Sequence, residues 1–580
     1  MSTAGWRRGA IAWWAVSSTV FLLVTAYYIL CHAVEPLSRD QWHMYDALLN
    51  HGLLETSLST TSGHRHILAF WLYHWDLQWG HGSNRLLLAV DWLLNGSLIV
   101  LLCVSAWALP LSRLARTLLC GWISVMLCWL INIALLGWGF NGINNFMSLV
   151  PGLLAIACLW RATQQHALIM AGWAGLLGIL ASLSFANGVL VWPTAFICLY
   201  WWRAPRNLFL ITLAATGIAV LLYISLPGAT AAQAALKWPG SAFFTFPAQV
   251  MGGPLYHLLR SWHLMDEQQL AVFATRAGIV ITVCAVWQFI QRLRQRQPLS
   301  VFASLCVALL CFGAGSCLML SMSRLDEFLD FTVDRFQIFA LLVWIGSVGL
   351  HICHAHPAVI RRWEIGFIVF PLLALPAQLD WGARLAEYRN RVDMALLAYQ
   401  VYLPVQADAE RALHWNWENK LPAFFNVLEY LRTTHSNVFY DGLAQHLTQT
   451  WTEASTLPTC SATVVRTQPI LARELLTVTH WPTAHRYAIP DAGNDDRIAG
   501  QRWFFQYNNT DWDGGVLLDA QHTVRGLVLP IHHSRLPRTS GLWHDAFNAY
   551  GIHRQDNASE SVRSLVLLRA HQPVCQQPLR

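Results

Sequence analysis

Charged side chains are scarce in this chain, because Asp, Glu, Lys and Arg make up only 12% of its 580 residues. Soluble domains carry about 25%. The deficit is concentrated in the first two thirds of the sequence, where apolar runs of about 18 to 25 residues recur. Each run can cross a hydrocarbon core of about 30 Å as a helix, which satisfies its own backbone hydrogen bonds in lipid. The composition therefore excludes an ordinary soluble protein and predicts an integral membrane protein.

The sequence also lacks the motifs of two common ligand classes. No P-loop and no glycine-rich nucleotide loop occurs in the arginine-containing connectors, which argues against ATP or a nucleotide-sugar as the substrate. The net charge is +6, but the Arg residues lie in short connectors, and no basic stripe with interleaved aromatic residues is present. We therefore expect no nucleic-acid partner.

The apolar runs predict an α-helical polytopic membrane protein with about eleven transmembrane helices. They are expected at residues 10–32, 84–108, 114–137, 144–160, 166–183, 186–202, 207–226, 269–291, 299–321, 335–353 and 363–379. The first run is too long for a signal peptide and has no small-residue cleavage site, so it is expected to remain as the first helix. Six arginine-containing connectors then fall on one side, which is cytoplasmic by the positive-inside rule, as is the N-terminus.

The longer connectors fall on the outer side, so chemistry is expected there. Residues 1–380 are predicted to form the transmembrane domain, with outer loops at 33–83, 227–268 and 322–334. The composition then becomes that of a globular protein. We expect a helical connector at 381–435 and an outer, β-rich domain at 436–580, in the form of a small β-sandwich. Its strands are expected at 437–440, 462–466, 502–507, 515–518, 525–530 and 563–568.

Cysteine usage agrees with an outer tail. Eleven of the 13 cysteines precede residue 354, mostly inside apolar runs, where they are typical of small buried hydrophobic residues. The tail contains only Cys460 and Cys575. An oxidising compartment favours a disulfide between them, and two unrelated buried thiols are the alternative.

The first outer segment offers the most informative carboxylates. Asp40 and Asp46 follow the first helix closely, so they are expected at the membrane surface near lipid phosphates. Sugar transfer needs a carboxylate that accepts the proton of the acceptor hydroxyl, or that holds a metal beside the leaving phosphate. Asp40 is the candidate base and Asp46 the candidate assistant. The alternative is that Asp40 caps a helix beginning near Trp42.

The same segment continues with His64, Arg65 and His66, which are donors suited to a phosphate or to sugar hydroxyls. The spacing of His64 and His66 also suits a divalent metal. Without a further clustered ligand, however, no metal site is assigned and no cofactor is expected with certainty. An interfacial basic patch that holds lipid headgroups is the alternative role.

Four more residues at outer helix ends complete the candidate substrate site. Arg335 opens a late helix from the outside, where it either clamps the donor phosphate or anchors the helix at the interface. Arg260 and His257 lie in the second of the long outer loops beside a Gly-Gly-Pro sequence, which predicts a shaped or mobile loop over the site. The amide of Asn187 is placed to contact a sugar hydroxyl or to form a turn.

These residues together resemble the GT-C superfamily of membrane glycosyltransferases. The resemblance rests on a first helix, a long outer loop with an early Asp in Arg39-Asp40-Gln41-Trp42, many helices and an outer C-terminal domain. It implies that Asp40 is the catalytic base and that the donor is a polyprenyl-phosphate sugar. The adjacent carboxylate pair common in GT-C first loops is here Asp40-Gln41, which puts a metal-dependent variant in doubt.

A closer resemblance is to a bacterial group of large membrane proteins with a periplasmic C-terminal domain. Its elements are matched by His64-Arg65, by Phe185-Ala186-Asn187-Gly188 before Trp192-Pro193, and by Arg335-Phe336. This likeness spans most of the chain and implies a multi-pass protein of the bacterial inner membrane. It names no substrate.

The expected function is therefore inverting transfer of a sugar from a polyprenyl phosphate to an acceptor glycan, lipid or protein on the periplasmic side. Arabinofuranosyl transfer is one activity that the resemblance allows. A ligase for a preassembled lipid-linked glycan needs the same outer site and stays open. The non-enzymatic alternative is a lipid or polysaccharide transporter, which should show repeated halves and polar groups at mid-membrane. No clear internal repeat is found, and polar groups gather at the outer helix ends.

Overall fold

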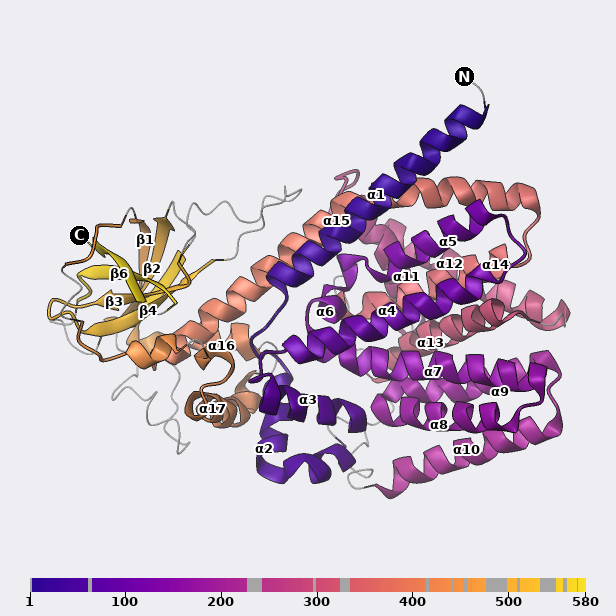
Figure 1. Cartoon of the computed structure of the whole chain (residues 1–580), viewed down its shortest axis with the longest axis horizontal. Coiled ribbons are helices and arrows are strands. Elements are labelled where there is room, and N and C mark those ends of the chain that lie inside the picture. Colours follow the sequence, from indigo (N-terminus) through magenta and orange to yellow (C-terminus); the bar gives the residue numbers. More distant parts are fainter. Residues whose placement is uncertain are drawn as a thin grey trace.

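The computed structural model describes residues 3–60, 65–226, 242–295, 299–323, 334–413, 417–440, 442–451, 456–460, 462–475, 498–507, 512–531, 549–555, 561–570 and 572–579. A bundle of helices forms most of the molecule, and an antiparallel sheet lies beyond one end of it (Figure 1). Candidate site residue His64 lies outside the described residues.

The first half of the bundle contains α1 (Thr3–His32), α2 (Gln41–Leu58), α3 (Ile67–Trp79), α4 (Arg85–Trp107), α5 (Arg113–Leu127), η1 (Leu130–Asn132), α6 (Ile133–Leu136), α7 (Gly139–Gln165), α8 (Leu168–Ser184), η2 (Ala186–Leu190), α9 (Val191–Trp202) and α10 (Arg206–Ser225). The second half and the connector contain α11 (Ala242–Arg260), α12 (Glu267–Gln295), α13 (Val301–Ser323), η4 (Asp334–Phe336), α14 (Gln337–Ile352), α15 (Pro357–Gln400), α16 (Gln406–Leu413) and α17 (Trp417–Thr433).

Seven helices in the described part of the chain are long and apolar enough to cross a membrane, as expected of a membrane-embedded protein. They are Gly9–His32, Arg85–Trp107, Arg113–Leu136, Gly139–Gln165, Arg206–Ser225, Glu267–Arg294 and Val301–Met322. All eleven expected segments are helical, but eleven spans are not confirmed. With 17, 12 and 16 residues, α8, α9 and α14 reach only roughly 26, 18 and 24 Å at 1.5 Å per residue. The eleventh expected span, 363–379, is part of the 44-residue helix α15.

Local signals explain where several helices begin. The Ser112 hydroxyl accepts a hydrogen bond from the Ala115 amide at 3.1 Å and caps the first turn of α5. Pro205 precedes α10, and Pro357 occupies the start of α15, where a missing N–H group is not needed. Because α15 continues to Gln400, no break in secondary structure marks the domain boundary expected at residue 380.

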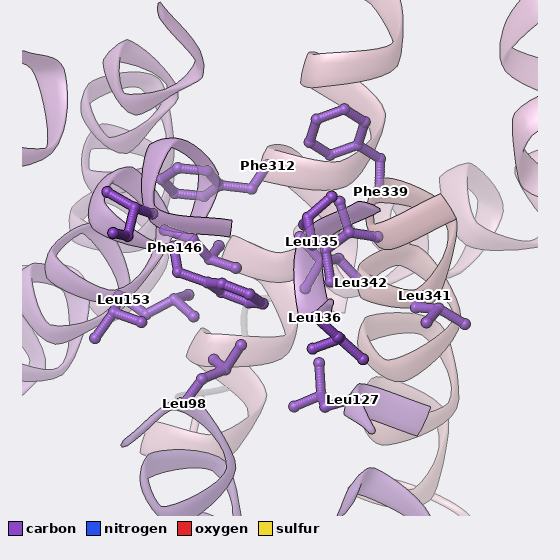
Figure 2. Packing of buried hydrophobic residues seen from close by; sticks show 14 of the residues in the cluster. Leu98, Leu127, Leu135, Leu136, Phe146, Leu153, Phe312, Phe339, Leu341 and Leu342 are labelled. Atoms are coloured by element: carbon purple, nitrogen blue, oxygen red, sulfur yellow. The ribbon is translucent and has the colours of Figure 1, made fainter. Parts of the chain in front are cut away.

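One continuous hydrophobic core holds the bundle together. Leu98 of α4, Phe146 of α7 and Phe312 of α13 contribute to it, together with Leu136 of α6 and Leu342 of α14 (Figure 2). Helix α7 packs against α8, α11 against α12, and α13 against α14. Helices α1 and α15 lie side by side, and α15 carries the chain out of the bundle towards the sheet (Figure 1).

The expected outer loops contain helices wherever the structure describes them. Residues 33–83 include α2 and α3, and α11 replaces the predicted mobile loop over residues 242–260. The glycines of α11 serve close packing: a Cβ atom on Gly252 would lie 1.9 Å from the backbone oxygen of Ala274 in α12. The expectation of a loop was therefore wrong for α11, since glycine also permits helices to approach closely. Residues 227–241 and 324–333 lie outside the described part of the chain.

The tail forms one continuous antiparallel sheet in the order β1-β2-β5-β4-β3-β6-β7, and not the two stacked sheets of the expected sandwich. Its strands are β1 (Ala462–Leu471), β2 (Ile498–Tyr507), β3 (Gly514–Leu518), β4 (Val524–Pro530), β5 (Ala549–Arg554), β6 (Ser564–Arg569) and β7 (Gln572–Pro578). The strand expected at 437–440 is instead a 3₁₀ turn, η5 (Asn437–Phe439), and β5 and β7 were not predicted.

The central strands β3 to β6 are largely buried, which explains their apolar sequences, whereas the edge strands β1 and β7 are mostly exposed. One face packs against the end of α15 through Leu397, and the other face contains Phe505 and Leu567. Cys460, just before β1, forms the predicted disulfide with Cys575 of β7, with an S–S distance of 2.08 Å. Because β1 and β7 are the two edge strands, the disulfide joins opposite edges of a curved sheet.

Candidate functional site

A cavity of about 280 Å³ lies where three segments of the bundle meet. Its walls come from the stretch between α1 and α2, from the segment containing η1 and α6, and from the middle of α15. The apolar part of the lining consists of Val34, Ile133, Ala134 and Leu385. The volume is near the lower end of the range for ligand pockets, about 300–1,000 Å³. It suits a compact group such as one sugar or one phosphate.

The polar part of the lining has an excess of positive charge. Three guanidinium groups, those of Arg39, Arg384 and Arg391, line the cavity together with the single carboxylate of Glu387. Glu387 pairs with Arg391, and Arg384 lies 3.2 Å from a carboxylate oxygen of Asp380. Among the lining residues themselves, three guanidinium groups face one carboxylate, and guanidinium groups are good donors to an anion.

Three aromatic rings complete the wall: Trp138, Trp381 and Tyr388. The guanidinium of Arg384 lies 4.7 Å from the centre of the Trp381 ring. Arg39 lies 4.8 Å from the centre of the Tyr388 ring and 5.3 Å from that of Trp138. Stacking of this kind holds guanidinium planes in place without neutralising their charge.

Arg39 has a backbone conformation that is uncommon for a residue with a side chain. Its φ is 56°, in the left-handed region, which costs of order 1 kcal/mol or more. The Nε group donates a hydrogen bond to the Tyr388 hydroxyl at 2.9 Å, and that hydroxyl also contacts the Ser38 hydroxyl at 3.0 Å. These bonds tie the stretch after α1 to α15, so they offset the strain and fix the residue next to Asp40.

Asp40 occupies the N-cap position of α2 and is half-buried. The alternative role predicted for it, capping, is not observed: its side chain accepts no capping hydrogen bond from the first turn. The following residue, Gln41, accepts a hydrogen bond from the Trp138 indole at 2.7 Å and donates one to Asn84 at 2.5 Å. Asp40 is therefore held between two residues whose contacts are made at the cavity wall.

A layer of buried polar groups supports this stretch. The side chain of Asn84 donates to the backbone carbonyls of Glu35 at 3.0 Å and Pro36 at 3.2 Å. The backbone N–H group of Asn84 donates to a carboxylate oxygen of Asp76 at 3.2 Å, and the Tyr45 hydroxyl donates to the same oxygen at 3.1 Å. Burial raises the pKa of Asp76 to about 6, although these hydrogen bonds act in the opposite direction.

Two further candidates lie behind the cavity wall. The ring of His257 packs nearly perpendicular to that of Trp381, with 4.8 Å between their centres. Arg335 opens η4, which packs against η1 and α6, and its guanidinium lies 5.0 Å from the centre of the Phe336 ring. His257 and the η4 turn that contains Arg335 thus pack against elements of the cavity wall, whereas neither residue, nor Asp40, is itself among the lining residues.

The remaining candidates on α2 and at the start of α3 have structural contacts elsewhere. Asp46 accepts hydrogen bonds from Asn50 at 3.0 Å and from Asn426 of α17 at 2.5 Å, so it joins α2 to the connector. Arg65 is fully buried and donates to three backbone carbonyls at 2.6–2.8 Å, which satisfies the ends of α2 and α10. His66 contacts Asn144 at 3.1 Å.

The last two candidates are also accounted for by local contacts. Asn187 accepts a hydrogen bond from the Ser148 hydroxyl at 2.6 Å, and Arg260 pairs with Glu267 at 2.7 Å. Neither residue lines the cavity. In the described part of the chain, no group of three or more His, Cys, Asp or Glu residues is arranged to hold a metal ion.

The sequence interpretation missed the wall that α15 supplies. Trp381, Arg384, Tyr388 and Arg391 are spaced by three, four and three residues, which places them on one face of a helix. That spacing indicates a shared helix face, but the composition of this segment predicts a connector outside the transmembrane domain. Comparison of the chain with models of protein families, with curated proteins and with solved structures finds no match.

Proposed function

We propose that the chain is a membrane glycosyltransferase that moves a sugar from a polyprenyl-phosphate donor to an acceptor on the periplasmic side of a bacterial inner membrane. The observation that carries the proposal is the cavity lined by three guanidinium groups and three aromatic rings, one wall of which is Arg39, the residue before Asp40. A sugar phosphate has the size, the negative charge and the apolar ring face that such a cavity accommodates.

The reaction is a single displacement at the anomeric carbon. The carboxylate of Asp40 accepts the proton of the acceptor hydroxyl, and the hydroxyl oxygen forms a bond to the anomeric carbon. The bond between that carbon and the phosphate oxygen breaks, and the lipid phosphate leaves with the electron pair. We assign the stabilisation of the charge that grows on the leaving phosphate to the guanidinium groups of Arg39, Arg384 and Arg391, which line the cavity. Attack opposite the leaving group inverts the anomeric configuration.

The test compares the purified protein with its Asp40→Asn variant on synthetic polyprenyl-phosphate sugars (glucose, mannose and arabinofuranose). The measurement is release of polyprenyl phosphate together with transfer to an added acceptor. Loss of a general base lowers the rate by about 10²–10⁴-fold. Asp46→Asn is the matched control, since the contacts of Asp46 are with Asn50 and with Asn426 of α17 and join α2 to the connector. Its rate should stay within a few fold of the original.

Two results would overturn the proposal. Unchanged transfer by the Asp40→Asn variant would remove the assigned base. The second result is that the original chain neither binds nor turns over any of the polyprenyl-phosphate sugars, and that the Arg39→Gln variant behaves in the same way. That result would show that polyprenyl-phosphate sugars are not the donors.

A further inference from the structure

Helix α3 presents an apolar aromatic face to its surroundings. Trp71, Trp75 and Trp79 recur every four residues and are 39%, 36% and 73% exposed. Their rings form a ladder, with centres 6.2 Å apart for the first pair and 5.8 Å apart for the second, stacked pair. The other residues of α3 that are not buried are Ile67, Leu68, His74 and Gln78. The face therefore contains neither a carboxylate, a guanidinium nor an ammonium group.

The only carboxylate of α3 and its tyrosine hydroxyl point in the opposite direction, whereas His74 and Gln78 are not buried. Asp76 and Tyr73 are fully buried, the first bonded to Tyr45 and the second to Asn144 at 2.9 Å. A surface helix in water buries its apolar stripe and exposes its charges. Helix α3 instead buries its one carboxylate and exposes three Trp side chains, which favours a medium outside the helix that is less polar than water.

The position of α3 identifies that medium. The His66 side chain before α3 contacts Asn144 near the start of α7 and lies 5.4 Å from the ring of Phe185, just after α8. Arg85 begins α4 six residues after Trp79. Helix α3 also packs against α4, α7 and α8. It therefore lies level with the ends of membrane-length helices, the depth at which Trp is enriched at the bilayer interface.

Exposed apolar side chains also occur on two helices close to α3. Leu93 on α4 is 69% exposed, and the last turn of α10, to which Arg65 is bonded, exposes 66% of Ile224. Both α4 and α10 are long and apolar enough to span a membrane, so these side chains face acyl chains.

We infer that α3 lies in the headgroup region of the bilayer with its three-tryptophan face on lipid. The inference stands on α3 alone and does not depend on the proposed sugar transfer. It has a consequence for the cavity, because Asp76 of α3 bonds to Asn84, which holds the carbonyls of Glu35 and Pro36. The depth of α3 in the bilayer thus determines how far the stretch that carries Arg39 lies from the lipid phosphates.

The experiment places a polarity-sensitive NBD probe at position 79. The exposed free cysteines Cys31 and Cys284 are replaced by Ser, Trp79→Cys is labelled, and the full chain is placed in phosphatidylethanolamine–phosphatidylglycerol nanodiscs. Quenching by lipids with a doxyl group at acyl carbon 5 is compared with quenching by aqueous iodide. Thr467→Cys on the exposed strand β1 is the control, expected to respond to iodide alone.

The expected result is at least twofold stronger quenching by doxyl lipid than by iodide at position 79. Stronger iodide quenching there would overturn the inference and favour a water-facing platform for a soluble glycan. A third outcome is that neither quencher reaches the probe and that the probe quenches itself more as the number of protein copies per nanodisc rises. That outcome would overturn the inference, because a second copy of the chain would then cover the face. Trp71→Cys, labelled in the same way, must give the same answer, so the result does not rest on one variant.

Discussion

Replacing Asp76 by Asn should change how the stability of the protein depends on pH. Burial raises the pKa of Asp76 from its ordinary value of 3.8 to about 6. The folded protein therefore holds this proton more tightly than the unfolded chain does. The contribution of Asp76 to the free energy of unfolding is largest below pH 3.8 and falls as the pH rises to about 6. At 1.36 kcal/mol per pH unit, ionised Asp76 costs the folded state about 3 kcal/mol above that range.

The Asp76→Asn variant keeps an oxygen that accepts from Tyr45 and Asn84, but it never ionises. The difference in unfolding free energy between variant and original should therefore shift by about 3 kcal/mol in favour of the variant between pH 3 and pH 8. The assay is unfolding in mixed micelles by a titration with SDS, followed by tryptophan fluorescence at each pH.

Tyr45→Phe provides a matched comparison. Its hydroxyl bonds to the ionised carboxylate and lowers the pKa of Asp76. Without it, the loss of stability should move to higher pH. The reasoning would be refuted if the unfolding free energies of the original chain and the Asp76→Asn variant changed with pH in parallel. Asp76 would then have the same pKa in the folded and the unfolded state.

Two more predictions concern the cavity and the tail. Tyr388→Phe removes the hydroxyl that contacts Arg39 and Ser38, and should lower kcat/KM for sugar transfer roughly tenfold, against an unchanged value for the exposed control Tyr440→Phe. Equal activity of the two variants would contradict a positioning role for Tyr388. Cys460→Ser opens a disulfide that spans 115 residues and should destabilise the tail by about 2–5 kcal/mol, measured as a lower Tm that dithiothreitol reproduces in the original chain. No effect of dithiothreitol on the Tm of the original chain would count against it.

The helical segments and the disulfide were accessible from the sequence because each depends on a local pattern or on a count. Long apolar runs predict helices, and two cysteines in the tail leave one possible pair. The number of spans was less accessible. Helix α9 has only 12 residues and follows the 3₁₀ turn η2, a division of one apolar run that periodicity does not show.

Site residues were predicted from their chemistry, which does not determine their partners. Arg65 has the right group for a phosphate, yet it is used to satisfy the carbonyl ends of two helices. Asp46 likewise binds an amide of α17, 380 residues away in the chain. The cavity could not be assembled for the same reason: Arg39 and Tyr388 meet only because α1 packs along α15.

Helix α15 has a mechanical consequence. Its interior prolines, Pro371 and Pro376, both precede Trp381, so the stretch from Trp381 to Leu397 is an uninterrupted helix of roughly 24 Å. Trp381 and Arg384 in the middle of α15 line the cavity, and Leu397 near its end is part of the core beneath the sheet. One wall of the cavity and the base of the sheet therefore belong to one continuous helix. A force that tilts the sheet, such as a bulky molecule binding to it, moves Arg384 without any intervening linker to absorb the motion.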